Sequence, residues 1–207
     1  MPRVSEAHLA ARRQQILDAA ARCFVRNGFH QTSMQDVIKE AGLSVGAFYR
    51  YFKSKNELII AIATAKIGEV TGVIDGLLED DPMPPIPVFL DAVISQVEAS
   101  INADQSVRIA VQIWGEATYD EEVAEIVRGI YGRIRKRAVR AAERAIASGD
   151  LPADADPAGV GAALFGLIQG YILQRILVGS NDRRLYIDGV RALLGAPEQQ
   201  PGSAARG

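Results

Sequence analysis

The sequence is poor in the residues that build disulfide frameworks and metal centres. Its 207 residues include one cysteine, Cys23, and two histidines, His8 and His30. A single cysteine excludes an internal disulfide and suits a reducing cytoplasm, and two histidines leave little for a histidine-based metal site. The opening residues, MPRVSEAHLAARRQQ, contain no apolar core and do not form a secretory signal. We therefore expect a cytoplasmic protein with no metal ion and no other cofactor.

Motifs of several enzyme classes are also missing. The sequence contains no HExxH, no P-loop, no glycine-rich dinucleotide motif and no paired cysteines. Cys23 falls on the apolar stripe of the first predicted helix, which indicates a core residue rather than a nucleophile. We expect no catalytic residues and no enzyme activity.

Strand-like alternation is scarce, whereas apolar residues recur at steps of three and four along almost the whole chain. This spacing predicts an all-α fold of about nine helices. A first helix is expected over about residues 6–27, and a long one opens after Ser54. Another begins near Gln105, a long amphipathic one at Asp120, and the last two cover about 156–178 and 185–194.

The formal net charge of −2 hides an uneven distribution. Residues 1–55 contain nine basic and four acidic side chains, a formal charge of +5, whereas the remainder contains 14 basic and 21 acidic side chains, or −7. A basic segment attached to an acidic body suggests that the first part contacts a polyanion such as nucleic acid. The alternative is a chance run of charges on solvated helix faces.

Residues 31–52 have the pattern of two short helices joined by a tight turn. Thr32 and Gln35 fit a capping box at the start of the first helix, and Gly42 fits its end. Ser44 fits the N-cap of the second helix. Behind a longer first helix, this arrangement predicts a helix-turn-helix.

The second helix of this motif has a small outward surface. Phe48 and Phe52, four residues apart, can anchor its inner side in the core. The residues left to face outward are Val45, Gly46, Tyr49 and Arg50. The major groove of DNA accommodates one such helix, whose N-terminal end reaches the base edges. Glycine is unfavourable at an exposed helical position unless a phosphate or base edge must approach the backbone.

A set of residues between Ala10 and Leu58 carries a specific family pattern. The set comprises Ile16-Leu17-Asp18-Ala19-Ala20, Phe24, Gly28-Phe29, Thr32-Ser33, Val37, Ala41-Gly42-Leu43-Ser44, Gly46, Phe48-Tyr49-Arg50-Tyr51-Phe52 and Lys53-Ser54-Lys55-Asn56-Glu57-Leu58. With these residues the segment resembles the DNA-binding domain of the TetR family of transcriptional regulators, without gaps and over about a quarter of the chain. Ile38 departs from the pattern, since the family often has a small alanine there.

The resemblance implies roles for particular residues. Thr32 and Ser33, at a helix N-terminus, would hold a phosphate, and Lys55 would meet another. Ser44, Tyr49 and Tyr51 would reach the DNA backbone or groove wall. The residues nearest the bases would be Val45, Gly46 and Ala47, helped by Arg50 or Tyr49. The alternatives are that Tyr49 and Tyr51 are partly packing residues and that Arg50 is simply exposed to solvent.

The resemblance also implies a domain organisation. Residues 1–55 would form the DNA-binding domain, ordered from about residue 6. Residues 56–195 would form a larger helical domain that binds a ligand and dimerises. Residues 196–207, rich in proline, glycine, glutamine and alanine, are expected to be a mobile tail.

A ligand pocket is expected around Trp114, the one tryptophan in the sequence. A mostly apolar cavity with a few polar groups is the usual ligand site. The residues we expect to line it are Phe89, Gln112, Trp114, Glu116, Tyr119, Tyr131 and Gln169. If Glu116 faced the cavity, a cationic ligand would be favoured, but it could equally cap a helix or face water. Trp114 itself could be plain core.

The apolar stretch 158–178 is long enough to cross a membrane, but Gln169, Gln174 and Arg175 oppose this. Its glycines allow a second helix to approach closely. We therefore expect no membrane partner and assign this helix to a homodimer interface; the alternative is an ordinary buried helix. The family resemblance implies that it packs with the last helix and their counterparts as a four-helix bundle. The expected interface residues are Phe165, Ile168, Ile172, Leu185 and Leu193.

These observations predict a dimeric, sequence-specific DNA-binding regulator. Two recognition helices would enter successive major grooves of a near-palindromic operator in double-stranded DNA. A repressor, released from its operator by a small and largely hydrophobic effector, is what the resemblance favours. The alternative is a DNA-binding regulator or architectural protein with no small-molecule ligand.

Overall fold

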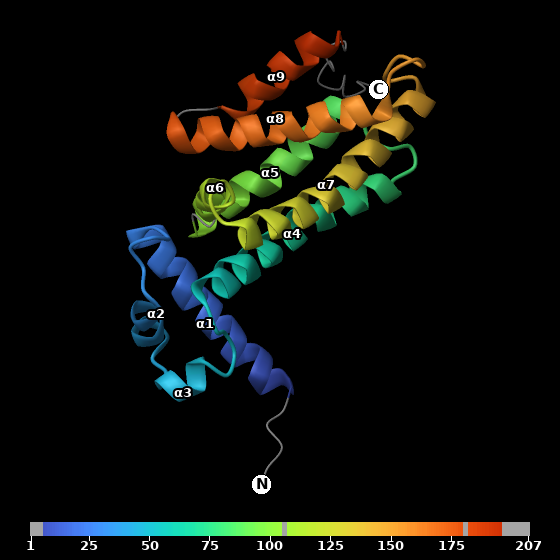
Figure 1. The fold of residues 1–207 in the computed structure, drawn as a ribbon. Coiled ribbons are helices and arrows are strands. Elements are labelled where there is room, and N and C mark those ends of the chain that lie inside the picture. Colours follow the sequence, from blue (N-terminus) through green and yellow to red (C-terminus); the bar gives the residue numbers. More distant parts are fainter. Residues whose placement is uncertain (1–5, 105–106, 180–181, 196–207) are drawn as a thin grey trace, which may run out of the picture.

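The computed structural model describes residues 6–104, 107–179 and 182–195, and within these ranges the chain forms nine helices and no strand (Figure 1). The helices are α1 (Glu6–Asn27), α2 (Met34–Ala41), α3 (Val45–Phe48), α4 (Lys55–Glu79), α5 (Ile86–Asp104), α6 (Val107–Glu116), α7 (Glu121–Ser148), α8 (Pro157–Leu177) and α9 (Arg183–Leu194). The all-α prediction is confirmed. The expected start near Gln105 and the expected mobile tail at 196–207 lie outside the described residues.

The first three helices enclose an apolar core at one end of the molecule (Figure 1). Ile16 and Phe24 of α1, Phe48 of α3 and Phe52 just after it are buried, as the spacing of the two phenylalanines predicts. This core continues beyond residue 55. Residues of the next helices that belong to it are Leu58, Ile59 and Ile62 of α4 and Ile109 and Ile113 of α6. The body is therefore packed directly onto the helix-turn-helix.

Helices α4, α5, α7, α8 and α9 stack into the larger part of the molecule (Figure 1). Helices α7 and α8 lie in close contact because of Gly161: a Cβ there would lie 2.9 Å from the Val139 backbone nitrogen. A glycine thus allows a close approach within this chain. Two arginines of α7 bind α4: Arg137 donates to Asp75 over 2.7 Å, and Arg144 donates to the Asp80 carbonyl over 2.8 Å.

Helix α8, Pro157–Leu177, is long and apolar enough to cross a membrane by length and composition, with a mean hydropathy of 1.4 over an 18-residue window. One such helix is weak support for a membrane span, because a buried helix of a globular protein has the same properties. Only 22% of that window is buried within this chain. Much of the apolar surface of α8 is therefore left uncovered by the described part of the chain.

Candidate nucleic-acid interface and apolar cavity

Helix α2 begins one residue later than expected. Ser33 is its N-cap, and its hydroxyl accepts a hydrogen bond from the Asp36 backbone N–H over 3.1 Å. The Asp36 carboxylate accepts in turn from the Ser33 N–H over 2.8 Å, which completes the capping box. These hydrogen bonds hold the pKa of Asp36 below its ordinary value. The expected capping box of Thr32 and Gln35 was wrong by one position.

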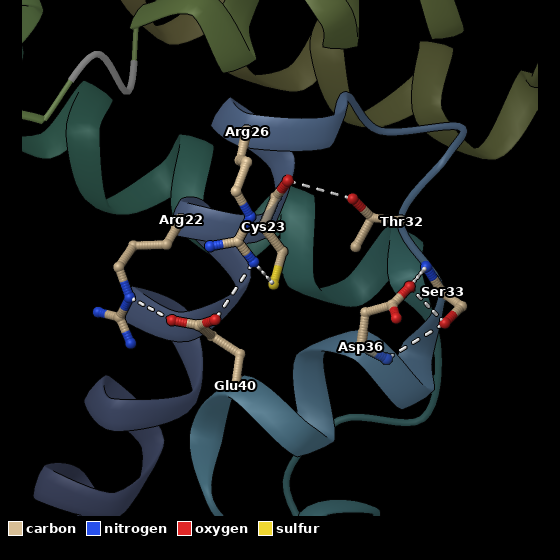
Figure 2. A network of polar contacts seen from close by, with 7 residues as sticks. All are labelled: Arg22, Cys23, Arg26, Thr32, Ser33, Asp36 and Glu40. Atoms are coloured by element: carbon tan, nitrogen blue, oxygen red, sulfur yellow. Dashed lines mark hydrogen bonds and ion pairs between the residues drawn. The ribbon is translucent and has the colours of Figure 1, made fainter.

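Thr32 is not a phosphate ligand in this structure. Its hydroxyl donates to the Cys23 carbonyl over 3.2 Å (Figure 2). It also donates to the Gly28 carbonyl over 2.8 Å, and the residue is 1% exposed. It joins the end of α1 to the start of α2. Ser33, which is exposed beside it, keeps the expected position at the helix N-terminus. The sequence pattern located the helix terminus but did not show which hydroxyl faces inward.

A carboxylate between two arginines ties α2 to α1. Glu40 pairs with Arg22 over 2.8 Å and with Arg26 over 3.2 Å (Figure 2). These bonds lower the pKa of Glu40. Cys23 lies beneath them, fully buried, and burial raises the pKa of its thiol. A protonated, inaccessible thiol fits the core role expected for Cys23.

Helix α3 presents its N-terminal end to the outside. Ser44 caps it by accepting from the Ala47 N–H over 3.3 Å, as predicted. Val45 is 57% exposed, and a Cβ added to Gly46 would meet no protein atom within 4 Å. Packing within the described chain therefore does not require glycine at position 46. Ala47 is partly exposed.

The aromatic residues after α3 are partly packing residues. Tyr49 and Tyr51 are half-buried against the first core, and the Tyr49 ring lies edge-on to Phe48 with a centroid distance of 5.9 Å. Arg50 is exposed and forms no hydrogen bond or ion pair with any residue that the structure describes. A free guanidinium beside the tip of the recognition helix can bind a phosphate or a guanine edge.

Lys55 does not point outward as expected. Its ammonium donates to the carbonyls of Phe29 over 2.8 Å and His30 over 3.4 Å, and it lies 4.4 Å from the centre of the Phe29 ring. Partial burial lowers its pKa. Lys55 thus joins the start of α4 to the loop after α1, and the role of phosphate ligand assigned to it is corrected.

A cavity of about 140 Å³ lies between α4, α5, α6, α7 and α8. Its lining residues are Ile62, Ala63, Lys66, Ile67, Val70, Ile74, Val97, Ser100, Ile109, Ala110, Ile113, Trp114, Val127, Ile130, Tyr131, Ile134, Phe165, Ile168, Gln169 and Ile172. The wall is aliphatic, with a few polar side chains, which is the composition of a small-molecule site. Lys66 is the one charged residue in this set, and its ammonium lies 3.4 Å from Glu69.

Three of the seven residues expected in the pocket line this cavity and lie together: Trp114, Tyr131 and Gln169. Gln169 donates to the Tyr131 hydroxyl over 2.8 Å, and the Trp114 side chain also hydrogen-bonds to Tyr131. The Tyr131 ring packs edge-on against Phe165 with a centroid distance of 4.8 Å. Burial raises the pKa of Tyr131 to about 12.

The other four expected pocket residues lie elsewhere. Phe89 is buried in a second apolar core, formed between α4, α5, α7, α8 and α9, and Tyr119 is 93% exposed. Gln112 and Glu116 face the DNA-binding end, by which we mean the part of the molecule that α1, α2 and α3 form. Glu116 lies 3.1 Å from the His30 imidazole. Glu116 therefore gives no reason to expect a cationic ligand. Helical spacing explains the error, because residues two apart on α6 lie on different faces.

The sequence reasoning missed the contribution of α4 to this cavity. Lys66, Ile67 and Val70 lie on its wall although none was singled out. A signal was present, because the apolar face of this helix is broader than one packing contact needs.

The expected dimer residues fall into two groups. Phe165, Ile168 and Ile172 of α8 line the cavity, and their role in a dimer interface stays a prediction. Leu185 and Leu193 of α9 are 72% and 83% exposed, as an interface requires. Both helices are apolar on two faces, and composition alone could not show which face was inward.

Helix α6 contacts the cavity and the DNA-binding end at once. Ile109, Ala110, Ile113 and Trp114 line the cavity. On another face, Gln112 accepts from the Phe29 N–H over 2.8 Å and donates to the Phe24 carbonyl over 3.4 Å. Asp120, just after α6, accepts from Asn56 over 3.2 Å. A shift of α6 must therefore move or break contacts with the end of α1.

Two family models match this chain. One, described as bacterial regulatory proteins of the tetR family, matches residues 16–62. The other, described as the C-terminal region of BetI-type transcriptional repressors, matches residues 89–196, about half of the chain.

Individual relatives agree with the family models. The chain is 46% identical over 63 residues to the HTH-type transcriptional repressor Rv1474c of Mycobacterium tuberculosis, covering 30% of this chain and 34% of that protein. The alignments with this and the next curated relatives span about a third of each relative's length. Among solved structures, Salmonella enterica GusR aligns with a TM-score of 0.75 and 26% identity over 94% of this chain and 98% of that one.

A further structure shows the same fold. Bacillus subtilis FadR in complex with stearoyl-CoA aligns with a TM-score of 0.73 and 23% identity, covering 89% of this chain and 99% of that one. The capped helix-turn-helix on an all-helical body defines a bacterial transcription regulator. The chain belongs to the TetR family.

Proposed function

We propose that this protein is a dimeric transcriptional repressor that leaves its DNA operator when a small, largely hydrophobic molecule occupies the cavity. The DNA-binding surface comprises the tip of α3, the N-terminus of α2 and Arg50. It carries no large apolar side chain besides Val45, so base reading would rely on close contact with Val45 and Ala47 and on Arg50.

One observation carries the proposal: α6 has the cavity on one face and the end of α1 on another. A ligand that displaces Trp114 or Ile113 would also shift Gln112, and with it the hydrogen bond to Phe29. Ligand and operator would then weaken each other's binding by the same factor. A regulator that senses nothing would not need such a cavity beside its DNA-binding end.

An apolar effector is favoured by the wall of the cavity. Related folds accommodate such ligands: FadR was solved with stearoyl-CoA, which carries a long alkyl chain. A volume of about 140 Å³ holds a ring or a short alkyl segment. A larger effector would have to part the helices, which is the movement that the proposal requires.

Dimerisation is supported by the uncovered surface of α8 and α9. Leu177, Leu185 and Leu193 are each more than 70% exposed in the single chain. Gly166 of α8 is exposed too, and a Cβ there would meet no atom of this chain within 4 Å. Large apolar side chains beside small ones fit a self-complementary interface of two helices from each protomer.

The direct test is a nuclease footprint of the purified dimer on the DNA upstream of its own gene. We expect protection of one near-palindromic segment with two half-sites about one helical turn apart. An Arg50→Ala variant should weaken the protection, whereas Arg108→Ala, on the exposed surface of α6, should not. A folded dimer that protects no segment would contradict the proposal.

A further inference from the structure

The polar cluster in the cavity consists of Tyr131, Gln169 and Trp114. It contains one hydrogen-bond donor that has no acceptor among the described residues. A tyrosine hydroxyl has two acceptor positions and one proton to donate. The Tyr131 oxygen accepts from the Gln169 amide over 2.8 Å, and the Trp114 indole, which also lines the cavity, can only donate. No described residue accepts the Tyr131 proton. Because Tyr131 lines the cavity, this proton is available to an acceptor bound there.

The spare donor does not depend on the orientation of the Gln169 amide. If the amide were reversed, its oxygen would accept the Tyr131 proton and its NH₂ group would face the cavity instead. In either orientation the cluster offers a neutral N–H or O–H donor at one point on an aliphatic wall. Burial raises the pKa of Tyr131 to about 12, so the hydroxyl keeps its proton at neutral pH.

The charges around the cavity oppose a cationic ligand. None of the residues found to line it is acidic, and the charged residue among them, Lys66, is a cation that pairs with Glu69 outside this set. A buried ammonium without a carboxylate partner pays a large desolvation cost. A neutral oxygen acceptor would instead complete the hydrogen bonding of the cluster.

We propose that the effector is a lipophilic molecule with an oxygen acceptor, such as a ketone or ester carbonyl, and no positive charge, and that the Tyr131–Gln169 pair donates to this oxygen. The hydrocarbon part would lie along Ile67, Val70 and Ile134. This inference rests on the proposed function, because it names the class of molecule that the cavity receives.

Two ligands with the same carbon skeleton test this proposal: cyclohexyl methyl ketone and 1-cyclohexylethylammonium. Each is titrated into the dimer, and its binding is measured by calorimetry. We expect the ketone to bind at least about 10-fold more tightly. A Tyr131→Phe variant should weaken ketone binding by about 2- to 12-fold, the range for one neutral hydrogen bond. It should leave the weak binding of the ammonium unchanged. Tyr119→Phe, at a 93% exposed tyrosine, is the matched control and should change neither value.

Several results would overturn the inference: equal or tighter binding of the ammonium, no binding of either ligand, or an unchanged ketone affinity in Tyr131→Phe. If Tyr131→Phe does not fold, Gln169→Leu serves the same purpose and should weaken ketone binding but not ammonium binding. The operator footprint separates this inference from the proposed function. Ketone binding that leaves the footprint intact would support the site and count against ligand-controlled release.

Discussion

At the scale of single residues, neighbouring side chains of one type have different roles. Thr32 and Ser33 both stand before α2, yet Thr32 is buried against two carbonyls and Ser33 is an exposed cap. Lys53 is exposed, whereas Lys55 is bonded to the loop after α1. The outward chemistry of the DNA-binding end is therefore carried by fewer residues than the family pattern implies.

Thr32→Val should destabilise the protein without removing a DNA contact. The change leaves the Gly28 and Cys23 carbonyls without this donor inside the fold, so we expect the free energy of unfolding to fall by about 1–3 kcal/mol. Urea denaturation measures this. Thr64→Val, at an exposed threonine of α4, is the control and should have little effect.

The pairing of Glu40 with Arg22 and Arg26 should make stability depend on pH. The folded state lowers the pKa of Glu40. Its contribution is therefore present above the ordinary glutamate pKa of about 4.3 and is lost as the pH falls through the lowered value. Glu40→Gln should be less stable than the wild type at neutral pH, and the two melting temperatures should converge in acid. A constant difference across this range would refute the assignment.

At the scale of elements, much of the fold follows from sequence. The bounds of α1 and the caps at Ser44 and Gly42 were predictable because they depend on local propensity and hydrogen bonding. The inward face of α8 was not, because glycine and aliphatic residues cover its whole circumference. The cavity also needed the structure, since Lys66 of α4 and Tyr131 of α7 come to line one cavity only through the packing of helices that are distant in sequence.

Helix α3 should tolerate a side chain at Gly46 in the free protein but not on DNA. A Cβ at Gly46 meets no protein atom within 4 Å, so Gly46→Ala should not lower the melting temperature. Operator affinity should fall at least about 10-fold, because the methyl group would stand where the base edges or a phosphate approach. Gly68→Ala, equally open on α4, is the control for binding measured by fluorescence anisotropy.

Helix α6 can be tested without an effector by filling the cavity from α7. Ile134→Trp adds a ring to the cavity wall from α7. If occupancy displaces α6, operator affinity should fall several-fold while the protein remains a folded dimer. Thr64→Trp places the same ring on the surface and should leave affinity unchanged. Unaltered operator binding by a folded Ile134→Trp protein would show that the cavity and DNA are not coupled.

At the scale of the whole molecule, charge is distributed unevenly: the DNA-binding end is basic and the body is acidic. The first 55 residues carry +5 and the remainder −7. A dimer would bring two basic ends to one operator, while the acidic bodies would repel DNA elsewhere. The near-neutral total therefore does not argue against nucleic-acid binding.

The dimer should depend on the exposed apolar face of α9. Leu193→Asp places a charge at a position that is 83% exposed in the single chain, so the fold should survive. In the interface the charge would be buried without a partner, and we expect a monomer by sedimentation velocity. Tyr119→Asp, at a 93% exposed site outside α8 and α9, should remain dimeric.

The central claim, that two basic ends bind one operator, is tested most directly by titrating the protected duplex at a series of salt concentrations. We predict two chains per duplex and an affinity that falls by about 10³-fold or more between about 50 and 200 mM salt, because phosphate contacts release counterions. We also predict clear preference over a scrambled duplex of equal length. A single chain per duplex, an affinity independent of salt, or equal binding of both duplexes would contradict the account.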